Sequence, residues 1–136
     1  MAALTEGRTT KSRELKTVAR GVLAGAKIYE GALTVITAAG FAKPGVTGLL
    51  LKAQGRAKGT IDNTAGANGA KTVEIERGCF QFANSAAGDL ITIADIGGTA
   101  YIVDDQTVAK TDGGGTRSAA GEIIDVEATG VWIKFG

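Results

Sequence analysis

A chain of 136 residues has the length of one domain, which at this size buries roughly 65–70% of its unfolded surface. The nearly balanced net charge of +1 gives no reason to expect nucleic acid or an anionic membrane as a partner. The absence of histidine excludes the commonest general base and the commonest metal ligand, and a single cysteine, Cys79, excludes an internal disulfide. Packing or assembly must therefore supply the stability.

The first 20 residues combine many charges with few apolar side chains. The acids are Glu6 and Glu14, and the basic residues are Arg8, Lys11, Arg13, Lys16 and Arg20. A solvated terminus is one interpretation of this segment. The other is an arm that becomes ordered on a partner, by adding a strand to its sheet or by placing Arg and Lys on its carboxylates. We therefore expect residues 1–20 to be an N-terminal arm, extended or ordered by a partner, and residues 21–136 to be a single β-domain.

Neither targeting nor membrane insertion is indicated. The N-terminus lacks the apolar core of a secretory signal, and the apolar runs are far shorter than the roughly 20 residues of a membrane helix. We expect synthesis in the cytoplasm.

From residue 22 onward the sequence predicts short strands separated by glycine turns. Two strands are expected over 22–29 and 33–37, around a turn at Glu30. In the second strand Leu33 and Val35 share one face, and the opposite face is also apolar in part. This strand is therefore expected to be covered on both sides.

The region 38–70 is expected to alternate turns with one more strand. Pro44 itself is not expected at a central strand position. Asp62 and Asn63 invite comparison with a calcium loop, but the oxygen ligands do not follow at alternate positions, so no calcium site is predicted. The expected elements are a turn over 38–45, a strand over 48–54, an exposed turn over 55–59 and a mobile loop over 62–70.

Residues 71–82 form the clearest strand of the chain. In the first half, Val73 and Ile75 alternate with Glu74 and Glu76, which is the pattern of a half-buried strand.

The alternation then slips by one residue at Arg77, Gly78 and Cys79, after which Phe80 and Phe82 carry the buried face. Such a slip at a glycine is typical of a β-bulge. We expect the chain to bend or to change sheets at this structural bulge.

The remaining sequence is also β in character. Thr92 is expected to cap a short helical turn, and 99–103 is expected to be a strand. Residues 121–127 and 130–135, joined by a turn that contains Gly130, predict a hairpin with a bulge. Strands about ten residues apart through the whole chain predict an all-β fold, a small β-barrel or a β-sandwich-like domain.

No combination of residues predicts an active site, a metal site or a cofactor site. Cys79 has Arg77 nearby but no histidine to form a catalytic pair, and a thiol without a catalytic role is the expected interpretation. Asp104 and Asp105 are adjacent acids that point in opposite directions, so a polar turn is expected.

Two further features are expected to have structural roles only. The glycine-rich stretch 113–117 lacks the ending and the helix of a phosphate loop, so a flexible tip is expected. Trp132 could stack on a sugar or a base, but in a terminal strand it is expected to pack against a neighbour.

Several short motifs occur in order from about residue 60 onward. They are Arg77, Gly78 and Phe80, the loop at Asn84 and Ser85, the turn from Asp95 to Gly97, the run YIVDDQ at 101–106, the run RSAAG at 117–121 and the final strand with Trp132. With these motifs the chain resembles the capsid cement, or head decoration, proteins of tailed bacteriophages. The resemblance covers about two-thirds of the chain, extends loosely over 20–55 and does not include the first 20 residues.

The resemblance implies a structural protein and not an enzyme. Such a protein binds the outside of the phage head as a homotrimer and bridges neighbouring subunits of the major capsid protein. It would lie on the outer surface of the virion, without direct contact to nucleic acid or membrane, and would need no cofactor. A capsid-binding role for the basic residues of the arm is an additional hypothesis. The alternative function is a virion-displayed module that binds a surface or a carbohydrate, suggested by Trp132 and the glycine-rich tips.

Overall fold

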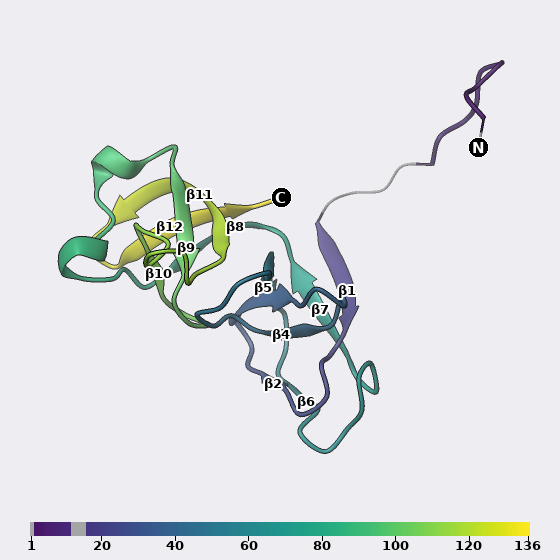
Figure 1. The fold of residues 1–136 in the computed structure, drawn as a ribbon, viewed down its shortest axis with the longest axis horizontal. Coiled ribbons are helices and arrows are strands. Elements are labelled where there is room, and N and C mark those ends of the chain that lie inside the picture. Colours follow the sequence, from purple (N-terminus) through teal and green to yellow (C-terminus); the bar gives the residue numbers. More distant parts are fainter. Residues whose placement is uncertain (1, 12–15) are drawn as a thin grey trace.

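The computed structural model describes residues 2–11 and 16–136, which form an all-β body with an N-terminal segment standing away from it (Figure 1). In the described residues there are two five-stranded antiparallel sheets and one two-stranded sheet. The predicted all-β class is confirmed. The sheets are not closed into a barrel, so the architecture is the sandwich-like one.

The first sheet carries the strands that come early in the chain. Its order is β1-β7-β5-β3-β4, with β1 and β4 at the edges. The bounds are β1 (Thr17–Gly21), β7 (Thr72–Glu76), β5 (Lys52–Ala57), β3 (Leu33–Ile36) and β4 (Ala42–Pro44). Two short strands, β2 (Lys27–Ile28) and β6 (Ile61–Asp62), pair separately.

The second sheet is built from the C-terminal half of the chain, in the order β10-β9-β11-β12-β8. Its bounds are β10 (Val108–Ala109), β9 (Thr99–Ile102), β11 (Ala119–Glu127), β12 (Gly130–Phe135) and β8 (Gly78–Phe82). Two 3₁₀ turns, η1 (Ala87–Asp89) and η2 (Ile93–Asp95), lie beside it. The predicted hairpin is β11 and β12. Its register shifts between Ile123 and Asp125, so the bulge lies within β11 and not at the turn that contains Gly130.

Two apolar clusters form the core, and β3 contributes to both. Leu33 and Val35, fully buried, pack with residues of the second sheet such as Ile133, whereas Ile36 packs with the other cluster, which contains Val73 and Ile75. The prediction that this strand is covered on both sides is confirmed. Because β3 fills the space between the two clusters, it has no solvent-facing side within Leu33–Val35.

The strand expected over 71–82 divides between the two sheets. β7 belongs to the first sheet and β8 to the second, and Arg77 lies at the junction. Gly78 has φ of 147°, which favours glycine. The predicted change of sheets is therefore confirmed, and Val73, Ile75 and Phe82 are buried as the alternation indicated.

Three predictions in the first half of the chain are wrong in their bounds. The strand expected over 22–29 is reduced to β2, because backbone groups before it bond to the 62–70 loop: the Ala24 N–H donates to Asn68 Oδ1 at 2.8 Å. The strand expected over 48–54 is shifted to β5, and the turn expected over 55–59 is partly strand. Gly55 belongs to the strand because its Cα lies against the backbone of β7, where a Cβ would be 2.1 Å from the Glu76 carbonyl oxygen.

The expected turn over 38–45 also contains a strand, the short β4, which ends at Pro44. β4 lies at the edge of the first sheet, where proline is tolerated because no second neighbour needs its missing N–H. The prediction that Pro44 does not occupy a central strand position is thus confirmed. The prediction that 38–45 is only a turn is wrong, because β4 lies within it.

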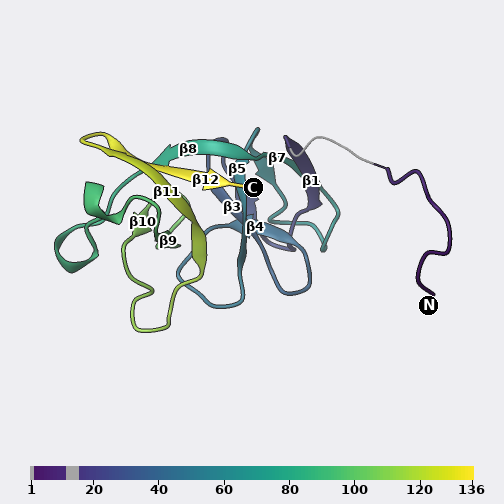
Figure 2. The ribbon, with the colours of Figure 1, turned by 90° about the horizontal axis from the view of Figure 1, so that it is seen from above.

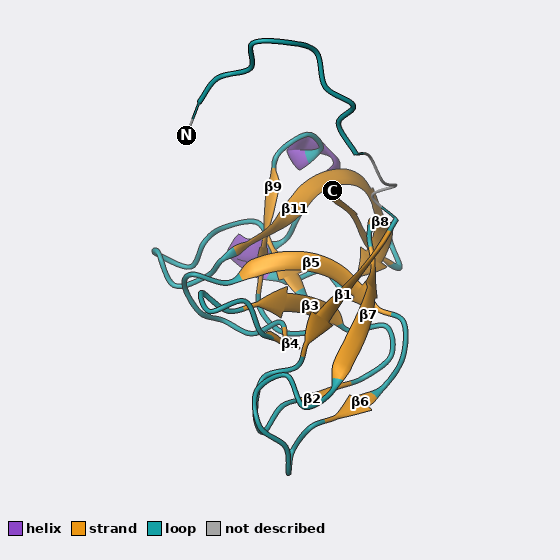
Figure 3. Ribbon diagram, turned by 90° about the vertical axis from the view of Figure 1, so that its right-hand side faces the viewer, coloured by secondary structure: helices purple, strands orange, loops and turns teal. Residues whose placement is uncertain are grey.

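The N-terminal arm is shorter than expected. β1 starts at Thr17 and pairs with β7, so the last residues of the predicted 1–20 arm belong to the body. Residues 2–11 are exposed and stand away from the sheets (Figure 3). Although this segment is mostly polar, its last residues pair with β7 because Val18 is buried in the smaller apolar cluster.

We predict that Gly78→Val lowers the free energy of unfolding by about 1–3 kcal/mol, because a β-branched side chain is strained at this positive φ. Urea denaturation followed by circular dichroism measures the change. Gly59→Val is the matched control, since Gly59 has open space around it and does not have a φ in the strained region. Cys79→Ser should change stability little because Cys79 is exposed. Equal stability of Gly78→Val and Gly59→Val would contradict the role given to Gly78.

Candidate functional site

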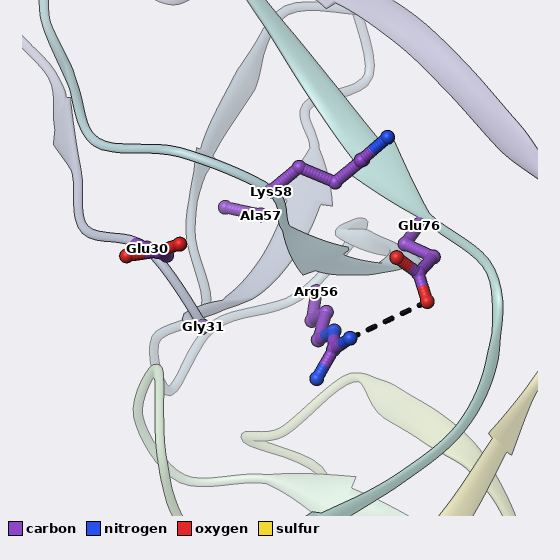
Figure 4. Close-up of a pocket in the computed structure, with 6 residues that line it drawn as sticks. All are labelled: Glu30, Gly31, Arg56, Ala57, Lys58 and Glu76. Atoms are coloured by element: carbon purple, nitrogen blue, oxygen red, sulfur yellow. Dashed lines mark hydrogen bonds and ion pairs between the residues drawn. The ribbon is translucent and has the colours of Figure 1, made fainter.

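Several charged residues line a shallow hollow on the first sheet, close to the start of the second. It has a volume of about 310 Å³, and its lining residues are Glu30, Gly31, Arg56, Ala57, Lys58 and Glu76 (Figure 4). The close-up shows Arg56 and Glu76 facing each other, with Glu30 on the opposite side. This hollow is the candidate site.

Strand pairing positions the charges of the hollow. Arg56 on β5 is the register partner of Glu76 on β7, and the guanidinium is 3.4 Å from the carboxylate. Lys58, just beyond β5, lies 3.8 Å from Glu74 in the same way. Because residues directly opposite on antiparallel strands bring their side chains together, these ion pairs follow from the register.

Arg56 has a second partner in the other sheet. Its guanidinium carbon lies 4.3 Å from the centre of the Phe80 ring on β8, a distance at which a cation is attracted to an aromatic face. Arg56 therefore covers the junction of β7 and β8 from outside. This arrangement is suited to holding the two sheets together, since both carboxylates on β7 already face a cation.

The hollow does not combine groups in a way that predicts catalysis. A nucleophile needs a base within hydrogen-bond distance, and a metal needs several converging ligands. Among the described residues, there is no group of three or more Cys, Asp and Glu side chains that could hold a metal ion. The hollow is thus a surface of mixed charge and not an evident reaction site.

The structural bulge does not form a reactive centre. The Cys79 thiol is exposed, and partial burial of its surroundings raises its pKa, against an opposing effect of Lys134. A raised pKa means less thiolate at neutral pH, and thiolate is the nucleophilic form. Arg77 donates its backbone N–H to the Lys16 carbonyl oxygen at 2.9 Å, which continues the pairing of β1 with β7.

Four of the five basic residues predicted for capsid binding lie among the described residues. Arg8, Lys11 and Lys16 are exposed, whereas Arg13 lies outside the described residues. Arg20 is in β1, where its Nε donates to Gln54 Oε1 at 3.2 Å. Arg20 therefore lies in the body and not in the arm.

The other candidate features have structural roles. Asp104 accepts the N–H of Gln106 at 2.9 Å, as expected for a polar turn. The Trp132 indole N–H donates to Glu127 Oε1 at 3.1 Å, which uses its polar atom within the hairpin. In the 62–70 loop, the buried Asn63 amide donates to three backbone carbonyls and holds the loop in place.

An ordered cluster joins the glycine-rich tip to the loop after β8. The Thr111 hydroxyl donates to the Asp89 carboxylate, and Arg117 Nη1 lies 3.3 Å from the same carboxylate. The hydrogen bond from Thr111, followed by that from Arg117, lowers the pKa of Asp89 below its ordinary value of 3.8. The predicted flexible tip is thus fastened at its base. The sequence does not indicate this contact, because Asp89 and Arg117 are 28 positions apart.

Comparisons with protein-family models, curated proteins and solved structures find no match to this chain. In the part of the chain that the structure describes, no helix is long and apolar enough to cross a membrane.

We predict that Arg56→Ala lowers the free energy of unfolding by about 1 kcal/mol, because it removes the contact with Phe80 as well as the ion pair. Glu76→Gln removes only the charge of an exposed pair and should cost less than about 0.5 kcal/mol. Chemical denaturation of both variants measures the difference. If Glu76→Gln costs as much as Arg56→Ala, the Phe80 contact contributes nothing.

We predict that Asp89→Asn lowers the melting temperature at neutral pH. A carboxylate whose pKa is lowered on folding stabilises the fold above its ordinary value of 3.8, and this contribution disappears as the pH falls through the lower folded value. The difference between wild type and variant should therefore shrink in strong acid. Asp112→Asn, at an exposed position of the same tip, is the control. A difference that does not depend on pH would contradict the assignment to this charge.

Proposed function

We propose that this chain is a viral structural protein, a cement protein that binds the outside of a tailed-bacteriophage head and bridges neighbouring subunits of the major capsid protein. The observation that carries the proposal is the exposed N-terminal arm, which leads into β1 at the edge of a compact β-body (Figure 3). The resemblance of residues 60–136 to capsid cement proteins supports it. In this proposal the chain is not an enzyme and needs no cofactor.

The geometry of the arm suits bridging. An extended chain of 15 residues, the length from 2 to 16, can span roughly 50 Å. The body can therefore rest on one capsid subunit while the arm reaches another. An arm that becomes ordered only on its partner loses conformational entropy, so each contact is weak. Many copies on one head act together, and the shell is stabilised by their sum.

The charge of the arm suits an acidic surface. Arg8, Lys11 and Lys16 are exposed, and Glu6 is the acid among the described residues of the arm. Exposed charges interact over about 10 Å at moderate ionic strength and are screened at higher salt. The proposed partner surface is therefore rich in carboxylates, and binding by the arm is expected to weaken as salt is added.

The proposal also includes a place and an assembly state. The protein is made in the host cytoplasm and resides on the outer surface of the capsid, where it acts as a homotrimer. It makes no direct contact with nucleic acid or membrane. A trimer interface of standard size, roughly 1,200–2,000 Å² for each pair of subunits, would supplement a core that contains few aromatic residues.

We predict that removing residues 2–15 reduces co-sedimentation with purified heads by about tenfold or more, while the body remains folded because β1 is kept. Reversal of charge at Arg8 and Lys11 to Glu should weaken binding less and reduce its dependence on salt. The matched control is Lys27→Glu together with Lys71→Glu, which changes the same amount of charge at exposed positions of the body. Undiminished binding of the truncated chain would contradict the role of the arm, and wild-type protein that binds no head would contradict the proposed function.

A further inference from the structure

The loop over 62–70 is bound to the chain that follows β1. The Asn63 side-chain amide donates to the Val22 and Leu23 carbonyl oxygens, at 3.1 Å each. The Gly25 N–H donates in turn to the Asn63 carbonyl oxygen at 3.0 Å. The first half of the loop is therefore fixed to that segment.

Asn68 and Gly69 fix the second half of the loop to the same segment. The Ala24 N–H donates to Asn68 Oδ1 at 2.8 Å. The Gly69 N–H donates to the Val22 carbonyl oxygen at 2.9 Å, and Gly69 has φ of 76°, which favours glycine. These contacts need an acceptor side chain at position 68 and a glycine at position 69. The fold itself therefore places an asparagine directly before a glycine.

An asparagine that precedes a glycine can lose its amide without an enzyme. The Gly69 main-chain nitrogen attacks the Asn68 side-chain carbon Cγ, and glycine has no side chain to obstruct this attack. A bond between these two atoms forms, the bond from Cγ to the amide nitrogen breaks, and ammonia leaves with the proton that Gly69 loses. Water then opens the cyclic imide to aspartate or isoaspartate. Each conversion consumes one water and releases one ammonia, so no oxidant or metal is needed.

The folded loop restrains this reaction. While the Gly69 N–H is bonded to Val22 and the Asn68 side-chain oxygen to Ala24, the attacking nitrogen and Cγ are not free to approach each other. Both hydrogen bonds must open first, and opening a surface loop costs less free energy than global unfolding. Asn68 and Gly69 are exposed, so water and hydroxide can reach them (the 62–70 loop connects β6 to β7 in Figure 2).

The other two asparagines of the chain are less suited to this reaction. Asn63 precedes Thr64 and Asn84 precedes Ser85, and the side chains of Thr64 and Ser85 obstruct the attacking nitrogen. Asn63 is also buried. Asn84 is fastened through both its amide nitrogen and its amide oxygen. Asn68 is therefore expected to be the first asparagine to convert.

We propose that Asn68 is a site of spontaneous deamidation, protected while the loop is bound to Val22 and Ala24 and reactive when the loop opens. Isoaspartate lengthens the main chain by one methylene before Gly69, so the two hydrogen bonds cannot both form again. Val22 is fully buried in the smaller apolar cluster, and the loss of these bonds loosens the loop that covers it. Each opening that leads to reaction therefore weakens the fold permanently. The inference concerns the chain alone and does not depend on the proposed function.

Comparison of folded and unfolded wild type tests the protection. Samples are kept in mildly alkaline buffer with or without guanidinium chloride, and tandem mass spectrometry follows the peptide that contains Asn68. Asn68 should convert about tenfold faster or more in the unfolded chain, because every molecule is then open. In guanidinium chloride it should also convert before Asn63 and Asn84. Equal rates in the two samples, or conversion of Asn68 no faster than that of the other asparagines, would overturn the proposal.

Asn63→Ala separates opening of the loop from global unfolding. It removes a side chain that binds the loop to the segment after β1 but leaves Asn68 and Gly69 in place, so conversion in native buffer should rise about fivefold or more. Asn84→Ala removes a comparable anchor in the loop after β8 and should leave the rate at Asn68 unchanged. If Asn63→Ala does not fold, wild type below its guanidinium midpoint replaces it and should convert faster than in buffer. An unchanged rate at Asn68 would overturn the link to loop opening.

The isoaspartyl product tests the effect on stability. Ion exchange isolates it from aged wild type by its additional negative charge, an isoaspartate-specific methyltransferase identifies it, and it should melt several degrees below fresh protein. Asn68→Asp keeps the acceptor oxygen for Ala24 and should melt near wild type. Asn68→Gln, aged in parallel, is the control, because its longer side chain disfavours ring closure while any change at Asp112–Gly113 still occurs. An isoaspartyl product that melts with fresh protein would overturn the proposed loosening.

Discussion

The fold depends on the short passage from β7 to β8. One continuous stretch of chain serves as a strand of the first sheet up to Glu76 and as an edge strand of the second sheet from Gly78. The direction of the chain changes at a residue with φ of 147°, so glycine is needed for the two sheets to face each other. When the two sheets face each other, β3 is enclosed between the two apolar clusters. Its side chains then pack against both of them.

The charged residues reinforce this passage and do not form a reaction site. Arg56 contacts Glu76 on one side of Gly78 and Phe80 on the other, so a single guanidinium spans the change of sheets. An exposed ion pair of this kind contributes little by itself, because water competes for both partners. Arg56 matters for the fold because it links β7 of the first sheet to β8 of the second sheet.

The parts of the fold that could be predicted from the sequence are those where burial alternates with a clear period. Val73 and Ile75 indicated β7, and Val131, Ile133 and Phe135 indicated β12, because large apolar residues at every second position place one face of a strand in the core. β5 was misplaced since its inward positions are occupied by small residues such as Gly55 and Ala57, which produce no hydrophobic alternation. The absence of a side chain at Gly55 is required by the close approach of β7, and that approach is a property of the tertiary structure.

Some surface features could not be predicted for the same reason: they depend on tertiary neighbours and not on a local pattern in the sequence. The pairing of Asp89 with Arg117, like that of Arg56 with Glu76, depends on which strands become neighbours, and nothing local in the sequence determines it. The leucines at 49–51 suggested part of an apolar strand over 48–54, yet Leu49 and Leu50 are exposed to solvent, and Leu50 takes a positive φ before Leu51 turns inward. A chain with few aromatic residues that leaves leucines exposed has apolar surface available for contact with another molecule.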